Sequence, residues 1–488
     1  MRLNQLLHNV QLLDTPGDLA VEVGAIRFDS RQVQPGDVFV AVKGAQADGH
    51  QFIDIAIEKG AVAIVHSSAA VTSSDRRTKP VLVRVTDSAE ALGIMAANYY
   101  GRPSEQMQLV GVTGTNGKTT TVTLLHQLFS RLGYRCGLIG TVENRIGETV
   151  LSSTHTTPDA VRLQGLLRSM ADAGCSHVFM EVSSHAVHQR RIAGAVFAGA
   201  AFTNLTHDHL DYHGSFAGYR DAKKKFFDDL TTNAFALTNV DDRNGEFLLQ
   251  NTAADQYTYG LKKPADYKTK ILENSLNGLY LQLDGEAVHA RLIGEFNAYN
   301  LTATYAIARL LQASKLETLT ALSDLRGAEG RFESVVHPTK PSCIGIVDYA
   351  HTPDALEKVL ETIQKLKKKT SRVVTVVGCG GDRDKAKRPL MAQAAARWSD
   401  QVILTSDNPR TEEPAQILRE MEAGLQGDDL RKSLTIENRD QAIKTAVRLA
   451  QAGDIVLVAG KGHEKYQDIQ GVKHPFDDKE VLEKYFQE

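Results

Sequence analysis

The sequence has few cysteines, no long hydrophobic run and no excess of charge of one sign. Its 488 residues include four cysteines, which are far apart and form no C-x-x-C pair, so we expect neither a disulfide framework nor a zinc site. No apolar run approaches the ~18 residues that a membrane-spanning helix needs, and polar residues interrupt the N-terminal stretch MRLNQLLHNVQLL, which argues against a signal peptide. The formal net charge of −3 gives no general attraction to nucleic acid. These absences predict a cytoplasmic protein with no membrane insertion and no nucleic-acid partner.

Short apolar runs alternate with amphipathic segments along the whole chain. The runs DVFVAV, VAIVH, MQLVGVT, HVFMEVSS, IGIVDYA, RVVTVVG, QVILTSD and DIVLVAG are nearly continuous, as expected for strands of parallel sheets that are covered on both faces. Breaks that contain Gly and Pro occur at residues 99–106 and 325–342. We therefore predict an α/β fold with three domains, at residues 1–102, 103–336 and 337–488.

The segment VGVTGTNGKTT, residues 110–120, is similar to a phosphate-binding loop. It departs from the common pattern G-x-x-x-x-G-K-[ST], because Val112 stands where the first glycine belongs. A strand is predicted before it, and a helix face running from Val122 is predicted after it. A glycine-rich turn into a helix N-terminus directs backbone N–H groups at an anion. Lys118 adds positive charge near the terminal phosphates and Thr119 adds a hydroxyl for Mg²⁺, which favours this interpretation over a glycine-rich loop with a solvated lysine.

Polar residues follow later strands of the same region. Glu181 ends the run SHVFMEVSSH, at a position where metal-binding acids are common. The segment TNLTHDHLDYHGS lacks matching cysteines and a helical H-E-x-x-H, so a polar loop beside phosphate is favoured over zinc; its acidic and histidine residues are His207, Asp208, His209, Asp211 and His213. The lysines at 223–225 lie on a predicted helix, where the simplest interpretation is a solvated face.

Two further motifs have structural interpretations. Thr352 and Pro353 are typical of a helix start, so the run Lys367–Lys369 complements the negative end of that helix rather than forming a nucleic-acid patch. VVGCGGDRD lacks the third glycine of the dinucleotide fingerprint, because Arg383 occupies its position, and NAD is therefore discounted.

A series of motifs, in order from about residue 26 to 468, resembles the Mur ligases, which are ATP-dependent amino-acid-adding enzymes of peptidoglycan synthesis. The motifs are GTNGKTT, MEVSSHAVHQRR, THDHLDYHGSFAGYRDAKKKFF, GEFNAYN, EGRFE, DYAHTPDAL, GCGGDRDKAKRP, DNPRTEEP and AGKGHEKYQ. Gly114 to Thr119 satisfies the shorter family loop G-x-x-G-K-[ST]. The resemblance implies an N-terminal α/β domain for the UDP end of the substrate, a central P-loop ATPase-like domain with a mostly parallel sheet, and a C-terminal Rossmann-like domain that brings the amino acid.

The resemblance also implies which residues form the site. For ATP they are Gly114, Thr115, Asn116, Gly117, Lys118, Thr119, Thr120, Asn297, Arg331 and Asp348. For catalysis they are Lys118, Glu181, His209 and Lys223, and for Mg²⁺ they are Thr119, Glu181, His209 and a carbamylated Lys223, since carbamylation makes an anionic oxygen ligand. For the UDP substrate they are Phe28, Ser30, Ala45, Gln46, Ala47, His155, Thr156, Thr157, Ser183, Gln189 and Arg191. His155 replaces the asparagine expected in the family, and Ala45 offers only backbone contacts.

The tetrapeptide DNPR, residues 407–410, resembles the signature of members that add meso-2,6-diaminopimelate, whereas lysine-adding members usually lack its arginine. Arginine can bind the additional distal carboxylate through two parallel hydrogen bonds. The implied pocket consists of Arg388, Asp407, Asn408, Pro409, Arg410, Gly460 and Glu464, with Glu464 facing the distal ammonium. The expected reaction is ATP-dependent addition of diaminopimelate to UDP-N-acetylmuramoyl-L-alanyl-D-glutamate through an acyl phosphate.

Other functions remain as alternatives. A lysine-adding member is one, and a folylpolyglutamate synthetase-like ligase is another that shares the loop but lacks the DNPR element. A GTPase switch is disfavoured because Val240 in TNVDD replaces the lysine of the N-K-x-D motif, and a non-catalytic binding module would have no need of Lys118, Glu181, His209 and Lys223 together. The expected partners are three small molecules (ATP, the UDP-muramoyl dipeptide and diaminopimelate) with Mg²⁺ as cofactor, and we expect a monomer.

Overall fold

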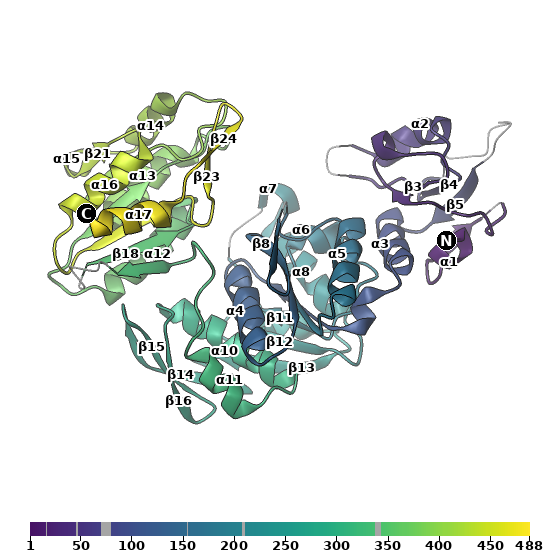
Figure 1. Ribbon diagram of the computed structural model, residues 1–488, viewed down its shortest axis with the longest axis horizontal. Helices are drawn as coiled ribbons and strands as arrows, with labels where there is room; N and C mark the ends of the chain where they lie inside the picture. The colour runs from purple at the N-terminus through teal and green to yellow at the C-terminus, as the bar shows by residue number, and fades with distance from the viewer. Residues whose placement is uncertain (16, 45–46, 70–79, 154, 207–209, 337–342) are drawn as a thin grey trace. The chain divides into compact units, whose positions relative to one another are not determined.

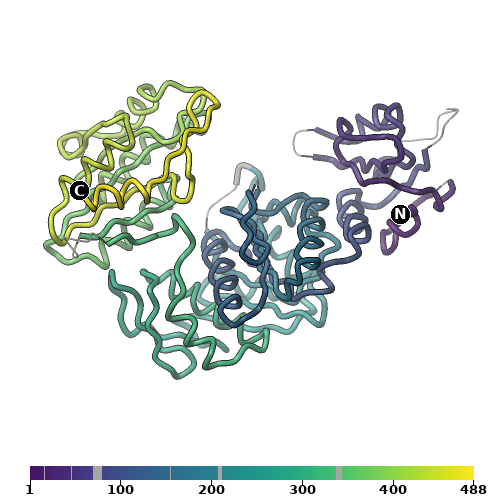
Figure 2. The backbone as a smooth tube through the Cα atoms, viewed as in Figure 1, coloured from purple at the N-terminus to yellow at the C-terminus, as the bar shows by residue number. Residues whose placement is uncertain are grey.

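The computed structural model describes residues 1–15, 17–44, 47–69, 80–153, 155–206, 210–336 and 343–488 (Figure 2). The chain is built from mixed α/β segments, each with its own sheet (Figure 1). Among the described residues, no helix is both long enough and apolar enough to cross a membrane.

The N-terminal segment forms a five-stranded sheet in the order β1-β5-β4-β3-β2. Its elements are α1 (Leu3–Leu6), β1 (Leu12–Asp14), β2 (Ile26–Arg27), β3 (Val38–Val40), α2 (Ile53–Glu58), β4 (Ala63–His66), β5 (Val81–Val85) and α3 (Ser88–Tyr99). All pairs are parallel except β1 with β5. The residues of β3 and β4 are fully or almost fully buried, which explains their continuous apolar runs.

The central segment carries a larger sheet whose middle strand precedes the phosphate-binding motif. Its elements are β6 (Gln108–Thr113), α4 (Lys118–Arg131), β7 (Cys136–Ile139), β8 (Glu143–Ile146), β9 (Thr149–Ser152), α5 (Ala160–Asp172), β10 (His177–Glu181), α6 (Ser184–His188), β11 (Gly199–Phe202), α7 (Leu210–His213), α8 (Phe216–Asp228), β12 (Phe235–Asn239), α9 (Gly245–Leu249) and β13 (Asp255–Gly260). In this 11-stranded sheet the order of these strands is β13-β12-β11-β6-β10-β7-β8-β9, parallel from β13 to β7 and antiparallel from β7 to β9, and the sheet continues past β13 with the three strands that follow it in the chain. Because β10 and β11 lie on opposite sides of β6, the loop after β6 opens at a switch point of the sheet, where ligands bind in such folds.

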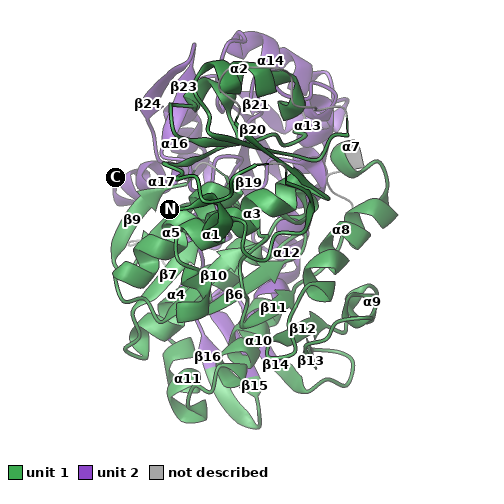
Figure 3. Ribbon diagram, turned by 90° about the vertical axis from the view of Figure 1, so that its right-hand side faces the viewer, with its two compact units in different colours: residues 1–270, 282–288, 298–323 green, residues 271–281, 289–297, 324–488 purple. Residues whose placement is uncertain are grey.

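The chain then continues through β14 (Tyr267–Ser275), β15 (Gly278–Leu283), β16 (Glu286–Ala290), α10 (Glu295–Leu310) and α11 (Lys315–Leu322). By compactness it divides into two units, which Figure 3 colours separately. Unit 1 consists of residues 1–270, 282–288 and 298–323, and unit 2 consists of residues 271–281, 289–297 and 324–488. Within unit 1, Ala160 of α5 belongs to the same apolar cluster as the N-terminal sheet, which ties the first two segments together.

The C-terminal segment is a six-stranded sheet covered on both faces. Its elements are β17 (Glu333–Val336), β18 (Ile344–Asp348), α12 (Pro353–Leu366), β19 (Val373–Val377), α13 (Lys387–Trp398), β20 (Gln401–Leu404), α14 (Pro414–Glu422), α15 (Asp428–Arg431), β21 (Ser433–Thr435), α16 (Arg439–Leu449), β22 (Ile455–Ala459), β23 (Tyr466–Ile469), β24 (Val472–Pro475) and α17 (Asp478–Gln487). The sheet order is β17-β18-β22-β19-β20-β21, and only β17 is antiparallel to its neighbour. One apolar cluster joins the sheet to α12, α13 and α14, and a second joins its other face to α16 and α17.

The strands predicted from the apolar runs are confirmed, at β3, β4, β6, β10, β18, β19, β20 and β22. The helix start at Thr352 is also confirmed, because its hydroxyl accepts a hydrogen bond from the Ala355 amide and α12 begins at Pro353. The predicted α/β class is thus correct. The exact boundaries between the three domains stay predictions.

Candidate active site

The loop from Gly114 to Thr119, called the phosphate loop below, joins β6 to the N-terminus of the 14-residue helix α4. Gly114 and Gly117 have φ angles of +150° and +87°, which side chains disfavour. A Cβ atom on Gly114 would lie 1.9 Å from the Thr203 hydroxyl oxygen, and one on Gly117 would lie 2.6 Å from an oxygen of Asn300. Both glycines are therefore required by space as well as by backbone conformation.

The segment after β11 supports this loop through neutral hydrogen bonds. The Thr115 amide donates to the Asn204 carbonyl at 2.7 Å, and the Asn116 amide donates to Asn204 Oδ1 at 3.0 Å. The Thr203 hydroxyl donates to the Asn116 carbonyl at 2.6 Å. A loop held in this way needs no rearrangement to bind an anion at the positive end of the helix dipole.

Lys118 lies over the phosphate loop. Its Nζ donates to the carbonyl oxygens of Gly114 and Thr115, both at 2.9 Å. These contacts hold the ammonium against the phosphate loop, and the role of Lys118 as a phosphate-binding lysine stays a prediction.

Glu181 at the end of β10 is fully buried next to the start of α4. Its Oε1 accepts hydrogen bonds from the Thr119 hydroxyl at 2.9 Å and the Thr141 amide at 2.8 Å, and its Oε2 accepts one from the Thr141 hydroxyl at 3.1 Å. Among the described residues, no lysine or arginine pairs with this carboxylate. A buried carboxylate with only neutral donors, beside a threonine hydroxyl, is an oxygen donor set that fits a hard cation such as Mg²⁺. Thr120, the next predicted ATP ligand, is also buried.

Lys223 of α8 lies under the phosphate loop. Its side chain is 1% exposed, and its Nζ donates to the Gly114 carbonyl at 3.0 Å and the Thr113 hydroxyl at 3.4 Å. Its Nζ also lies 4.8 Å from the centre of the Tyr219 ring. The interpretation of residues 223–225 as a solvated face is therefore wrong for Lys223 and Lys224, which are buried, and correct only for Lys225.

The residues predicted to bind the UDP substrate between 157 and 191 form one hydrogen-bonded group. The Thr157 hydroxyl donates to the Glu181 carbonyl at 2.8 Å, and Ser183 donates its amide to that hydroxyl at 3.1 Å. Arg191 donates to the Thr157 carbonyl at 2.9 Å and grips the Gln189 side-chain oxygen with two nitrogens, at 2.9 and 2.6 Å. Because Thr157 bonds to the Glu181 carbonyl and the Glu181 carboxylate bonds to Thr119, this group is connected to the phosphate loop through Glu181.

The other predicted UDP-substrate residues are spread more widely. The Thr156 hydroxyl accepts a hydrogen bond from Thr141 at 3.0 Å, whereas His155 is exposed. In the N-terminal segment Phe28 is 40% exposed and Ser30 is buried, and the Ala47 carbonyl oxygen accepts a hydrogen bond from the Gly44 amide at 2.9 Å. Ala45, Gln46 and the metal candidate His209 lie outside the described residues.

The remaining nucleotide candidates lie in unit 2, around the end of β18. Asp348 is buried and accepts hydrogen bonds from the amides of Phe332, at 2.7 Å, and Ala350, at 2.8 Å. Burial raises the pKa of Asp348, and the charge of Arg331 opposes that rise. The Arg331 guanidinium lies 4.6 Å from the centre of the Tyr349 ring. Arg331 and Asn297 line a cavity of about 490 Å³, so these residues border a space large enough for part of a ligand.

The predicted amino-acid pocket, also in unit 2, is centred on Asn408 and Glu464. Asn408 Nδ2 donates to Glu464 Oε2 at 2.7 Å. Burial and the nearby Asp407 raise the pKa of Glu464, and Lys461 and Asn408 oppose the rise. Gly460 has a φ of +116°, and a Cβ there would lie 2.6 Å from an Asp407 carboxylate oxygen, so glycine is required. The residues after β20 and after β22 are thus brought together across 50 residues of sequence.

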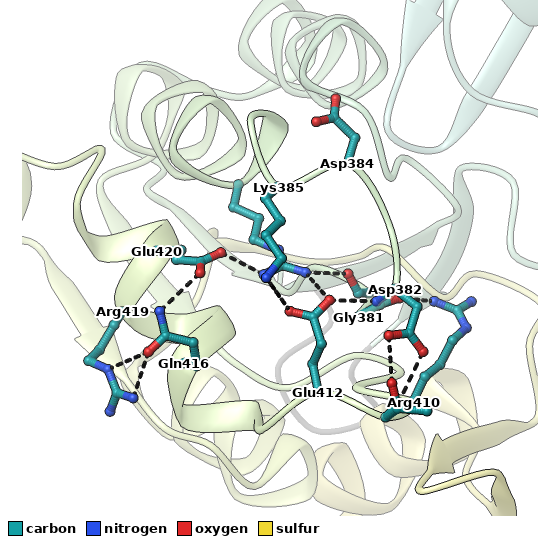
Figure 4. A network of polar contacts seen from close by, with 12 residues as sticks. Gly381, Asp382, Asp384, Lys385, Arg410, Glu412, Gln416, Arg419 and Glu420 are labelled. Atoms are coloured by element: carbon teal, nitrogen blue, oxygen red, sulfur yellow. Dashed lines mark hydrogen bonds and ion pairs between the residues drawn. The ribbon is translucent and has the colours of Figure 1, made fainter.

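Arg410 and Arg388 have different surroundings. Arg410 has a positive φ of +52° and donates Nη1 to the Gly381 carbonyl at 2.6 Å. Arg388 is fully buried, and its guanidinium pairs with Glu412 and Glu420, two carboxylates of the polar network that Figure 4 labels. Its nitrogens bind Glu412 at 3.0 and 2.8 Å and Glu420 at 2.6 Å. Glu412 and Glu420 therefore compensate the charge of Arg388. Arg388 acts on the predicted pocket indirectly, through the loop that carries Glu412.

Three features of the site were not predicted. Thr141 binds Glu181 with both its amide and its hydroxyl. Lys461, within the GKGHE motif, is fully buried and contacts Asn408 and Glu464. Arg439 pairs with Asp478 below the same loops, at 2.6 and 2.7 Å. A lysine between two glycines was the available signal for Lys461, whereas nothing local in the sequence marks the other two.

Three family descriptions match successive parts of the chain. They are "Mur ligase family, catalytic domain" over residues 22–100, "Mur ligase middle domain" over 112–308 and "Mur ligase, glutamate ligase domain" over 330–462. With a phosphate loop at a sheet switch point followed by a second α/β sheet, the chain belongs to the Mur ligase family.

Two curated relatives and one solved structure that match nearly the whole chain share one name. A protein of Cytophaga hutchinsonii named UDP-N-acetylmuramoyl-L-alanyl-D-glutamate--2,6-diaminopimelate ligase is 54% identical over 482 residues, covering 99% of this chain and 98% of the relative. A Geobacillus kaustophilus protein of the same name is 43% identical over 471 residues, covering 94% of each. A solved structure with this name has a TM-score of 0.73 at 33% identity, covering 100% of this chain and 99% of that chain.

Proposed function

We propose that the protein joins meso-2,6-diaminopimelate to UDP-N-acetylmuramoyl-L-alanyl-D-glutamate, with conversion of ATP to ADP and phosphate, during peptidoglycan precursor synthesis. The observation that carries the proposal is the 54% identity over nearly the full length to a ligase of that name. The phosphate loop in unit 1 and the charged pocket in unit 2 support it, because the reaction needs one site for phosphates and one for a zwitterionic amino acid.

The reaction has two steps. The γ-carboxylate of the D-glutamyl residue attacks the γ-phosphorus of ATP, which forms an acyl phosphate and releases ADP. An amine of diaminopimelate then attacks the acyl carbon, and the tetrahedral intermediate expels inorganic phosphate as the amide bond forms. The phosphate loop amides and Lys118 stabilise the negative charge of the transferring phosphoryl group, because they are already positioned around it.

Mg²⁺ fits the oxygen donors of Thr119 and Glu181, which we assign as its ligands. When bound, the ion neutralises charge on the phosphate oxygens. Thr141 holds the Glu181 carboxylate in place through two hydrogen bonds, and Thr157 fixes the strand end by binding its carbonyl. We assign His209 and a carbamylated Lys223 to a second Mg²⁺. The support is that the Lys223 amine is buried beside Gly114, where a carbamate would add anionic oxygens next to the phosphate loop.

We assign the substrate contacts from the family resemblance and from the positions of the residues in the structure. The group around Thr157, Ser183, Gln189 and Arg191 binds the dipeptide part of the UDP substrate, since it adjoins Glu181. The N-terminal residues Phe28 and Ser30, together with residues 45–47, bind the UDP end of the substrate. His155 and Thr156 complete the substrate-binding residues.

On the nucleotide side we assign Asn297, Arg331 and Asp348, which lie at or near the cavity of unit 2. For the amino acid, Arg410 binds the distal carboxylate of diaminopimelate and Glu464 its distal ammonium. Asp407, Asn408, Pro409 and Gly460 shape the pocket, and Arg388 supports it through Glu412.

The proposal is tested with purified protein and a phosphate-release assay, with mass spectrometry of the product. We expect release only when ATP, the UDP-muramoyl dipeptide and diaminopimelate are all present, and little release with GTP. Full turnover with L-lysine and little with diaminopimelate would reassign the chain to the lysine-adding members. Turnover with a folate substrate would favour the folylpolyglutamate synthetase alternative. The monomeric state and the cytoplasmic location stay predictions.

A further inference from the structure

Lys461 is a buried cation that the proposed mechanism does not use. It follows β22 (Ile455–Ala459) after one glycine, its side chain is 0% exposed, and its Nζ donates to Asn408 Oδ1 at 3.0 Å. The same Nζ lies 3.5 Å from Glu464 Oε2 and 5.5 Å from the centre of the Tyr466 ring. Burying an ammonium costs several kcal/mol unless it is paired, on the order found for isolated ions in proteins. Its position therefore depends on Asn408 and Glu464.

These contacts determine the orientation of the Asn408 amide. Two donors, Lys461 Nζ at 3.0 Å and the Asp468 amide at 2.9 Å, point at the same side-chain atom of Asn408, which must be the oxygen. The nitrogen must then face the Glu464 carboxylate, where it donates at 2.7 Å. Without Lys461, the amide would lose one of the two donors that set this orientation.

Lys461 also balances the charge of the pocket. The carboxylates of Asp407 and Glu464 are both largely buried, and the pKa of Glu464 is already raised by burial and by Asp407. The charge of Arg439 interacts with Asp407 and Glu464, but Arg439 is itself paired with Asp478. Tyr349 is a further titratable group that faces Glu464. Lys461 is thus the cation in direct contact with Glu464 among the described residues. A neutral residue at 461 would favour the protonated form of Glu464.

We propose that Lys461 is a positioning residue for the incoming amino acid, whose ammonium fixes the Asn408 amide and the Glu464 carboxylate in the arrangement that receives the distal ammonium of the substrate. This inference rests on the proposed function. It assigns to the lysine of the GKGHE motif a role in selecting an amino acid with two ammonium groups, although Lys461 itself does not touch the substrate.

The test compares Lys461→Met with Lys473→Met in steady-state kinetics of the full chain. Lys473 is a matched control, because its Nζ lies 4.2 Å from the centre of the same Tyr466 ring but the residue is exposed and outside the pocket. We expect Lys461→Met to raise KM for diaminopimelate by about 10- to 100-fold, as for the loss of hydrogen bonds to a charged group. KM for ATP and for the UDP substrate should change less than twofold. Lys473→Met should resemble the wild type.

The pH profile separates positioning from a general loss of stability. The acidic limb of kcat/KM for diaminopimelate should move to higher pH in Lys461→Met, because Glu464 must be ionised to bind an ammonium. If Lys461→Met does not fold, Lys461→Gln keeps a donor for Asn408 Oδ1 and removes only the charge, so it should still move the limb. An unchanged KM and an unchanged acidic limb in a folded variant would overturn the inference. Absence of diaminopimelate incorporation by the wild type would instead contradict the proposed function.

Discussion

The phosphate loop and the amino-acid loop, residues 405–410, both follow a buried parallel strand, yet different interactions hold them. The phosphate loop is fixed by neutral groups, chiefly Thr203 and Asn204, and Lys118 supplies positive charge beside it. Buried ion pairs surround the amino-acid loop, as between Arg388 and Glu412. A site for a polyanion is weakened by nearby acids, whereas a site for a zwitterion needs charges of both signs. The comparison predicts that the two regions respond differently to substitution and to pH.

The largest effect is expected from removing the charge at the phosphate loop. Lys118→Met should lower kcat by about 10³-fold, because phosphoryl transfer depends on pre-positioned charge. Thermal stability should change little, since the hydrogen bonds from Lys118 to the Gly114 and Thr115 carbonyls lie within its own loop. Phosphate release at saturating substrates measures the change. Lys225→Met, which removes an exposed lysine paired with Asp229, is the control, and equal losses in both variants would contradict the role of Lys118.

A smaller effect is expected at the metal candidate. Glu181→Gln keeps an oxygen acceptor for Thr119 or Thr141 but removes the negative charge. We expect about 10²-fold lower activity at limiting Mg²⁺, with partial recovery as Mg²⁺ is raised, because a neutral amide is a weaker ligand for a hard cation. A magnesium titration of the initial rate measures this. Glu143→Gln, in β8 of the same sheet, is the control; a Mg²⁺ dependence equal to that of the wild type in Glu181→Gln would remove Glu181 from the metal site.

The comparison also explains which parts were predictable from the sequence. The phosphate loop was predictable, because its glycines, lysine and threonine are close together in sequence and lie between a strand and a helix that local patterns predict. Glu181 was placed correctly at a strand end for the same reason. The burial of Lys223 was not evident from composition, because successive helical residues point about 100° apart and only packing decides which of three lysines faces inward.

The charged region was predicted less completely. Its partners are distant in sequence: Arg388 pairs with Glu412 and Glu420, which are 24 and 32 residues away, and Lys461 bonds to Asn408, which is 53 residues away. The motifs identified the loops but not which charges compensate one another. The interpretation of Arg388 as a pocket residue came from the motif alone, and the structure adds that its charge is already paired. Such pairing follows from the order of the strands in the sheet, which no local pattern contains.

In the charged region, Arg410 should determine the choice of amino acid. Arg410→Lys keeps the charge but cannot make two parallel hydrogen bonds to a carboxylate. We expect kcat/KM for diaminopimelate to fall by about 10- to 100-fold while any activity with L-lysine changes little, because lysine lacks the distal carboxylate. Competition between the two amino acids, read by mass spectrometry of the product, measures the ratio. Arg419→Lys, on the exposed face of α14, is the control, and an unchanged ratio in Arg410→Lys would assign the distal carboxylate to another group.

The smallest effect concerns stability and pH, and it tests the contrast between neutral and charged support. Hydrogen bonding to Arg388 lowers the pKa of Glu412 to about 2 from its ordinary value of 4.5. A carboxyl group whose pKa is lowered by folding stabilises the protein above its unfolded pKa, and this contribution is lost as pH falls from about 4.5 towards 2. Glu412→Gln should therefore destabilise the C-terminal sheet at pH 7 by about 1 kcal/mol, since Glu420 still pairs with Arg388. The difference from the wild type should shrink below pH 4.5.

The single tryptophan makes this measurable in the intact chain. Trp398 ends α13, the helix that carries Arg388, so its fluorescence during urea unfolding reports on the C-terminal sheet. Glu413→Gln is the matched control, because Glu413 is the exposed neighbour of Glu412 and should leave the unfolding midpoint unchanged. A Glu412→Gln midpoint equal to that of the wild type at pH 7 would mean that Glu420 alone compensates Arg388, and the amino-acid loop would then be no more dependent on charge than the phosphate loop.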